Sequence, residues 1–196
     1  MPDFIRRNLV LVCAFCLISC GDIPVQTQTP ELTYSHLGLF RLDVSEIQIV
    51  NKFVPAMRLP NIEHLMPVAP AFAAKSWAED RLQKKGSSGR RAIFTILDAS
   101  VVKSPLRKKN GVRGTFTIDQ SELYKASVKV RLEIFNLDGS SAGAVEAASW
   151  RSKSVPENIT LNDRDKVWFH LTEAVTNELN SELERSIPKF LGNYLR

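Results

Sequence analysis

Residues 124–134 read Tyr-Lys-Ala-Ser-Val-Lys-Val-Arg-Leu-Glu-Ile and hold the clearest alternation of apolar and polar side chains in the chain. Successive side chains of a β-strand point to opposite faces of a sheet. The stretch therefore predicts a strand with one buried face and one face in water. This decides the fold class, because such a strand needs paired neighbours and a second layer that covers its apolar face.

The neighbouring segments supply further strands. Residues 142–152 follow an Asp138-Gly139 turn and predict a weaker strand, and residues 93–102 are apolar and rich in β-branched side chains. Residues 40–49 alternate as well, but the apolar parity shifts near Ser45, which predicts a single strand with a bulge there. Because the gaps between the later strands are of hairpin size, we expect a mostly antiparallel sheet.

Two segments have the spacing of amphipathic helices. The first is expected to begin at Pro70 and to end at Lys85 and Gly86, with apolar residues three or four positions apart. The second is expected to begin near Asn162 and to end or kink at Pro188. Its apolar stripe consists of Trp168, Leu171, Val175, Leu179, Leu183 and Ile187.

Together these elements predict an α+β two-layer sandwich, with a mostly antiparallel sheet of four or five strands and two amphipathic helices. We expect residues 32–196 to form one domain. The proline-rich apolar loop at residues 53–68 admits two interpretations: it drapes over the core, or it forms an exposed patch for an acyl chain or another protein.

The N-terminus predicts export and a lipid anchor. Arg6 and Arg7 precede an apolar run at residues 9–18, which is too short to span a bilayer but is typical of a secretory signal peptide. The run ends in Leu17-Ile18-Ser19-Cys20, which resembles the lipobox of bacterial lipoproteins. A generic signal peptide with a coincidental cysteine is the alternative.

The lipoprotein resemblance implies that residues 1–19 are a signal peptide and that Cys20 is acylated after cleavage. Residues 20–31 would then be the lipidated cysteine and a flexible tether. Gly21 stands where an aspartate retains enteric lipoproteins in the inner membrane, so the resemblance favours the outer membrane, facing the periplasm. The other two cysteines, Cys13 and Cys16, lie in the signal peptide, so we expect no disulfide in the mature chain.

The charge pattern gives a second candidate site. The formal net charge is +5, which is too mild to suggest nucleic acid as a partner. However, residues 81–113 contain ten basic residues and one acidic residue. If they gather on one edge they could bind an anionic surface such as lipid headgroups, and otherwise they are solvated loop charges. The candidates are Arg90, Arg91, Arg107, Lys108 and Lys109.

Few residues indicate catalysis. Residues 139–143 read Gly-Ser-Ser-Ala-Gly and match the nucleophile-elbow pattern, which makes a hydrolase using Ser141 and His170 the alternative function. Such an elbow needs a parallel strand followed by a helix, whereas here the pattern joins two alternating strands. The three histidines lack the spacing of a metal site. We therefore expect no catalytic residue, metal or cofactor.

Trp77-Ala78-Glu79 followed by Leu82 resembles the auxiliary lipoproteins of bacterial ABC-type lipid-transport systems. Those proteins are small, tethered by a lipobox cysteine and α/β in fold. The resemblance covers the lipobox and one helix. It implies a noncatalytic adaptor in envelope lipid transport or assembly, held on the membrane by its anchor and bound to an envelope protein partner.

Overall fold

The centre of the fold is a long antiparallel hairpin formed by β6 (Gln120–Phe135) and β7 (Ser141–Pro156). This computed structural model describes residues 31–106, 120–156 and 158–196, and Glu31–Arg196 form one compact unit. The alternating stretch at residues 124–134 lies in β6. From Tyr124 to Ile134 its six apolar side chains are at most 1% exposed.

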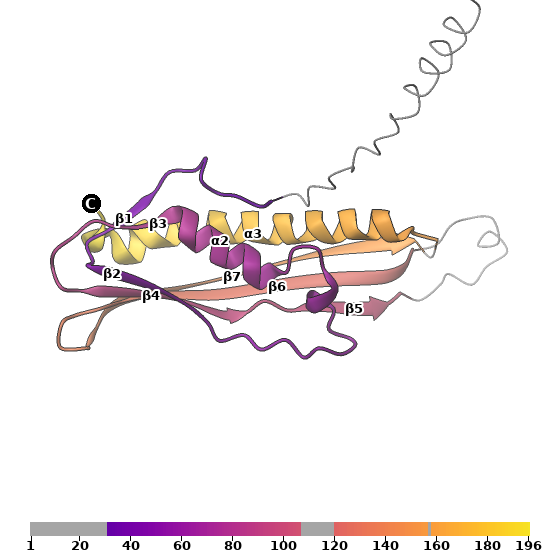
Figure 1. Cartoon of the computed structure of the whole chain (residues 1–196), viewed down its shortest axis with the longest axis horizontal. Coiled ribbons are helices and arrows are strands. Elements are labelled where there is room, and N and C mark those ends of the chain that lie inside the picture. The colour runs from indigo at the N-terminus through magenta and orange to yellow at the C-terminus, as the bar shows by residue number, and fades with distance from the viewer. Residues whose placement is uncertain (1–30, 107–119, 157) are drawn as a thin grey trace, which may run out of the picture. The chain divides into compact units, whose positions relative to one another are not determined.

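Three more strands complete the main sheet (Figure 1). β4 (Arg91–Asp98) pairs antiparallel with one part of β6, and β5 (Val101–Pro105) pairs antiparallel with another part. Both lie on the side of β6 away from β7. β2 (Glu46–Asn51) pairs in parallel with β4. The single strand expected at residues 93–102 is therefore two strands. The break has a local cause, because the Asp98 carboxylate accepts hydrogen bonds from the Ser100 amide and hydroxyl, both at 3.2 Å.

A separate two-stranded parallel sheet contains β1 (Phe40–Leu42) and β3 (Leu82–Lys84). The prediction of one bulged strand at residues 40–49 is thus wrong, since β1 and β2 belong to different sheets. The prediction that the first helix extends to Lys85 is also wrong. Leu82 has extended backbone angles, φ −97° and ψ 122°, because it pairs with Phe40 in β1.

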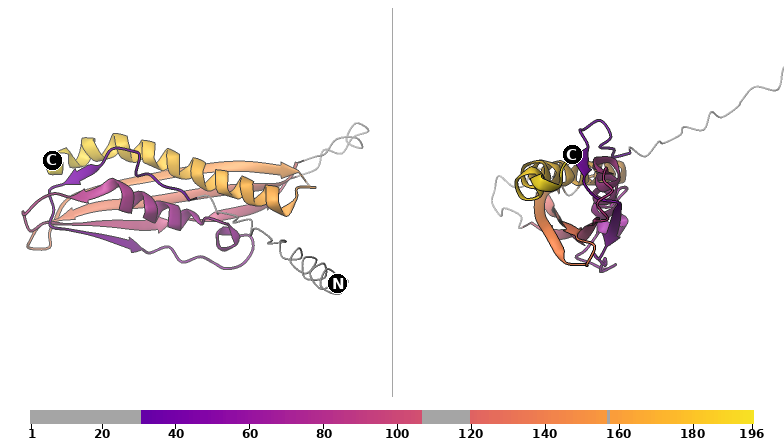
Figure 2. Two further views of the ribbon diagram at one scale, coloured as in Figure 1. Left: turned by 45° about the horizontal axis from the view of Figure 1, so that its top comes forward. Right: turned by 90° about the vertical axis from the view of Figure 1, so that its left-hand side faces the viewer.

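Both long helices lie on one face of the main sheet (Figure 2). α2 (Pro70–Arg81) packs against β4 and β6, and α3 (Leu161–Leu191) packs against β7 and β6. Thr160 caps α3 by accepting a hydrogen bond from the Asp163 amide. α3 does not end at Pro188 but continues to Leu191. Two short 3-10 helices, η2 (Glu63–Leu65) and η4 (Gly192–Tyr194), complete the described elements.

Polar contacts at the helix pair supplement the hydrophobic core. Trp77 is fully buried, stacks against Phe94 with ring centroids 5.7 Å apart, and donates a hydrogen bond of 2.8 Å to Asn180 of α3. The buried Arg81 pairs with Glu184 at 2.8 Å. The α+β two-layer fold with two helices and a mostly antiparallel sheet of five strands is confirmed.

Candidate functional site

Because α2 and α3 cover the same face of the sheet, neither of these two helices covers the opposite face. We call it the outer face. Near the β2 edge it contains a hollow of about 250 Å³. Its apolar lining consists of Val50, Ile93, Leu97 and Phe135, and its polar lining of Lys52, Thr95, Arg131 and Glu133. Such a mixture suits a protein surface that binds a partially apolar ligand or partner.

A ladder of ion pairs crosses the outer face from β6 to β7. Glu146 pairs with Lys129 at 2.9 Å and with Arg131 at 3.1 Å, and Arg131 also pairs with Glu133 at 2.9 Å. The Arg131 guanidinium and the Ser141 hydroxyl lower the pKa of Glu133, and hydrogen bonds from Lys129 and Arg131 lower the pKa of Glu146. The charges in this ladder neutralise one another, so it does not form an anion-binding patch.

The apolar loop at residues 53–68 packs partly on the core and is partly exposed, so each of the two interpretations of the sequence holds for one half of it. Its second half joins the core, since Ile62, Met66 and Val68 are buried. Its first half is exposed: Val54 is 83% exposed and Leu59 is 71% exposed. The loop therefore supplies both core residues and an exposed apolar surface.

Arg90 is occupied by contacts within the fold. Its guanidinium pairs with the buried carboxylate of Asp43 at 3.2 Å and lies 5.3 Å from the ring centroid of Tyr194. Its Nε donates to Asn136 at 3.4 Å. Arg91 is exposed and lies 5.4 Å from the ring centroid of Phe135. Of these two arginines, Arg91 is the more available to a ligand.

Arg91 lies far from Pro105, the end of β5. Arg107, Lys108 and Lys109 lie outside the described residues. Pro105 pairs with Glu122, whereas Arg91 pairs with Phe135 at the other end of β6. At about 3.3 Å per residue these two positions are about 40 Å apart along the strand.

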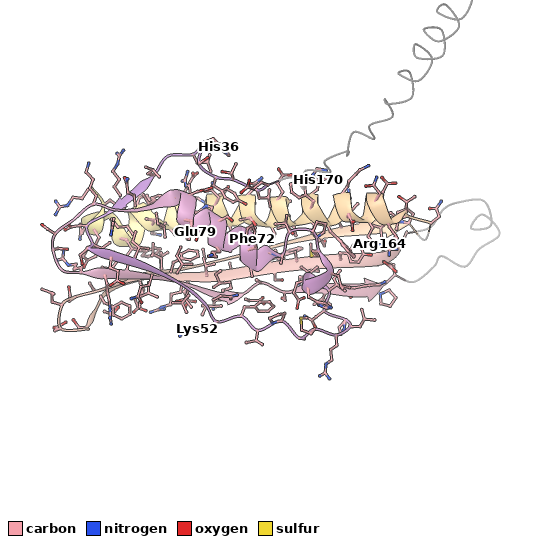
Figure 3. The ribbon with its side chains drawn as sticks, viewed as in Figure 1. His36, Lys52, Phe72, Glu79, Arg164 and His170 are labelled. Atoms are coloured by element: carbon pink, nitrogen blue, oxygen red, sulfur yellow. The ribbon has the colours of Figure 1, made fainter. Side chains whose placement is uncertain are left out.

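Ser141 and His170 are also far apart. Ser141 begins β7 and donates a hydrogen bond of 2.7 Å to Glu133. His170 lies on α3, on the opposite side of the molecule from Lys52 (Figure 3), and is 3.3 Å from Glu173. It lines a hollow of about 390 Å³ together with Ser152, which is eleven residues along β7 from Ser141, or about 35 Å. The pair that the hydrolase alternative requires is therefore not assembled.

Two further motifs of the sequence are the lipobox cysteine and the Trp77-Ala78-Glu79 stretch. Cys20 lies outside the described residues. Trp77 and Ala78, which carry the resemblance to transport lipoproteins, are buried between α2 and the sheet. Among the described residues there is no cluster of His, Cys, Asp or Glu that could hold a metal ion. Within the same residues, no helix has the length and apolar content needed to cross a membrane.

The hollow on the outer face was not predicted from the sequence. The signal was nevertheless present in β4, where apolar residues occur at both parities, as in Ile93, Phe94, Ile96 and Leu97. Apolar side chains on both faces of a strand indicate that both faces make contacts or that one carries an exposed apolar patch.

No protein-family model matches the chain, and no curated protein matches its sequence. Among solved structures the chain is similar to a minor lipoprotein from Acinetobacter baumannii, with a TM-score of 0.39 and 14% identity, over 74% of this chain and 90% of that chain. It is also similar to a dodecameric PelC variant from Paraburkholderia phytofirmans, with a TM-score of 0.22 and 17% identity, over 73% of this chain and 90% of that chain. At these TM-scores neither likeness establishes a shared fold.

Proposed function

We propose that this chain is a lipid-anchored lipoprotein of the bacterial cell envelope and acts there as a noncatalytic adaptor in lipid transport or assembly. The observation that carries the proposal is the sequence at Cys20, where a basic N-terminus and an apolar run lead into Leu17-Ile18-Ser19-Cys20. Several acyl chains on one cysteine anchor a protein firmly, since each buried methylene contributes about 0.8 kcal/mol.

The adaptor role is supported by the outer face. Its hollow offers Ile93 and Phe135 to a partner, and the ion-pair ladder beside it supplies a polar border of the kind that surrounds many protein interfaces. Gly21, rather than aspartate, after the anchored cysteine favours the outer membrane as the location.

The anchor is tested by metabolic labelling with palmitate. Because Cys20 alone would receive the lipid, Cys20→Ser should abolish labelling and leave an unprocessed precursor. Cys13→Ser and Cys16→Ser are matched controls and should be labelled like the native chain. Equal labelling of the Cys20→Ser protein would refute the lipoprotein assignment.

The adaptor role is tested by crosslinking in the same cells. A photoreactive group at Ile93 should crosslink an envelope protein, and one at Leu161 on the helix side should not.

A further inference from the structure

The 52–59 segment, which joins β2 to the remainder of the apolar loop, projects three large apolar side chains into solvent. Val54 is 83% exposed, Met57 is 63% exposed and Leu59 is 71% exposed. Single exposed apolar residues are common on protein surfaces, but three within six residues of one segment are not readily explained by packing. This arrangement makes the segment a candidate contact surface.

The segment is held in place at both ends by the edge of the main sheet. The Lys52 amide donates to the Ile96 carbonyl at 2.9 Å. At the far end, the Lys103 amide donates to the Pro60 carbonyl at 2.8 Å, and the Ile62 amide donates to Val101 at 2.9 Å. The exposed side chains are therefore presented from a fixed base, on the side of the molecule away from the helices (Figure 3).

The charge and backbone of the segment suit an anionic lipid surface. Residues 47–62 contain the exposed Lys52 and Arg58 and no acidic residue. Basic side chains beside exposed apolar ones are typical of segments that enter the headgroup region of a bilayer. Pro55 and Pro60 have no amide hydrogen, so fewer backbone donors lose water when the segment enters the interface.

We propose that the 52–59 segment inserts its apolar side chains into the headgroup region of an anionic membrane, as a second contact beside the lipid anchor. This proposal rests on the proposed function, because acylated Cys20 would keep the domain near a bilayer. The chain from Cys20 to Leu32 can span at most about 40 Å. Within that reach the local concentration of lipid surface is high, so even a weak contact is occupied.

The cysteine content of the chain allows a direct test. All three cysteines lie at positions 13, 16 and 20, so residues 20–196 carrying Cys20→Ser have no thiol. Among the residues that the structure describes, every core side chain lies at or beyond Leu32, and this form therefore keeps the whole described core. Val54→Cys, Leu59→Cys, and the control Leu137→Cys are then labelled separately with an environment-sensitive fluorophore. Leu137 is a matched control because it is 81% exposed and lies in the β6–β7 turn.

With vesicles containing phosphatidylglycerol, we expect the emission at positions 54 and 59 to shift to the blue and to rise about twofold or more. A nitroxide attached to the lipid near the headgroups should quench it, while position 137 should change little. Equal emission with and without vesicles at positions 54 and 59 would overturn the proposal. A shift of the same size at position 137 would overturn it as well, because it would show nonspecific adsorption.

Three further variants separate the contribution of the charges from that of the apolar side chains. Lys52→Gln and Arg58→Gln should each weaken vesicle binding roughly fivefold at low salt. Val54→Asn, Met57→Asn and Leu59→Gln together should abolish the binding that persists at high salt, and asparagine suits the positive φ of 55° at Met57. Unchanged binding in this triple variant would refute insertion. Since the test protein has no lipid, a negative result here leaves the anchor at Cys20 to be judged by palmitate labelling alone.

Discussion

At the residue scale, the carboxylate of Asp43 is held by contacts from two separate parts of the chain. It is buried, and it accepts charge-assisted hydrogen bonds from Arg90 at 3.2 Å and from Arg196 at 2.7 Å. Gly86 packs directly on it: a Cβ built on Gly86 would lie 2.2 Å from Asp43 Oδ1 and 2.9 Å from the Asp43 backbone carbonyl carbon. The contacts of Arg90 within the fold could not be predicted from the sequence. Its charge is visible there, but its partner 47 residues away is not.

Replacing Gly86 should therefore destabilise the domain. Because the added methyl group meets backbone as well as a side chain, Gly86→Ala should lower the free energy of unfolding by about 1–3 kcal/mol. Gly38→Ala is the matched control, since no described atom lies within 4 Å of a Cβ at Gly38, and it should change stability by less than about 0.5 kcal/mol. Urea denaturation of both variants measures the difference. Equal stability of the two would mean that the region around Asp43 adapts freely.

At the scale of elements, the predictable parts are those with a long uninterrupted period. β6 alternates over eleven residues and α3 repeats its apolar stripe over five turns, so both were identified correctly. β3 was missed because Leu82 fits the helical spacing of α2, and only its pairing with β1 makes it extended. Short segments are decided by such distant partners, which local periodicity does not contain. The outer-face hollow was missed for a related reason, because it forms only where β2, β4 and β6 lie together.

The ion-pair ladder between β6 and β7 predicts how stability depends on pH. The pKa values of Glu133 and Glu146 are lowered from 4.5 in the folded protein. The unfolded chain therefore takes up protons at a higher pH than the folded one. The stability from this ladder is fully present above pH 4.5 and is lost as the pH falls below that value, through the folded pKa values. Solvent screening keeps the contribution modest, because Glu146 is well exposed.

Glu133→Gln should remove part of this dependence. Measured by urea unfolding at a series of pH values, the free energy of unfolding of the variant should fall less steeply below pH 4.5 than that of the native chain. Arg131→Gln removes the principal donor to the same carboxylate and should flatten the curve in the same direction. Parallel curves for all three proteins would show that the ladder does not contribute to acid sensitivity.

At the scale of the whole molecule, the C-terminus ties together parts that the main sheet leaves separate. The Tyr194 hydroxyl donates to the Ala142 carbonyl of β7 at 2.8 Å, and the Tyr194 carbonyl accepts from the Asp43 amide at 2.7 Å. The Arg196 amide donates to Arg41 of β1 at 2.9 Å. In this way η4 and the residues after it connect the small β1–β3 sheet to α3 and to the start of β7.

Removing residues 192–196 should consequently loosen the domain at the β1 end without exposing the centre of the core. Three hydrogen bonds at about 1 kcal/mol each predict a loss of roughly 3 kcal/mol in the free energy of unfolding. Arg196→Ala is the matched control: Arg90 still pairs with Asp43 in this variant, and the backbone hydrogen bonds of residues 192–196 remain, so it should lose less stability than the truncated chain. Hydrogen exchange should rise first at the amides of β1 and β3. If the truncated chain unfolds at the same urea concentration as the control, the small sheet is held by its own pairing and by Leu42, and the C-terminal contacts contribute little.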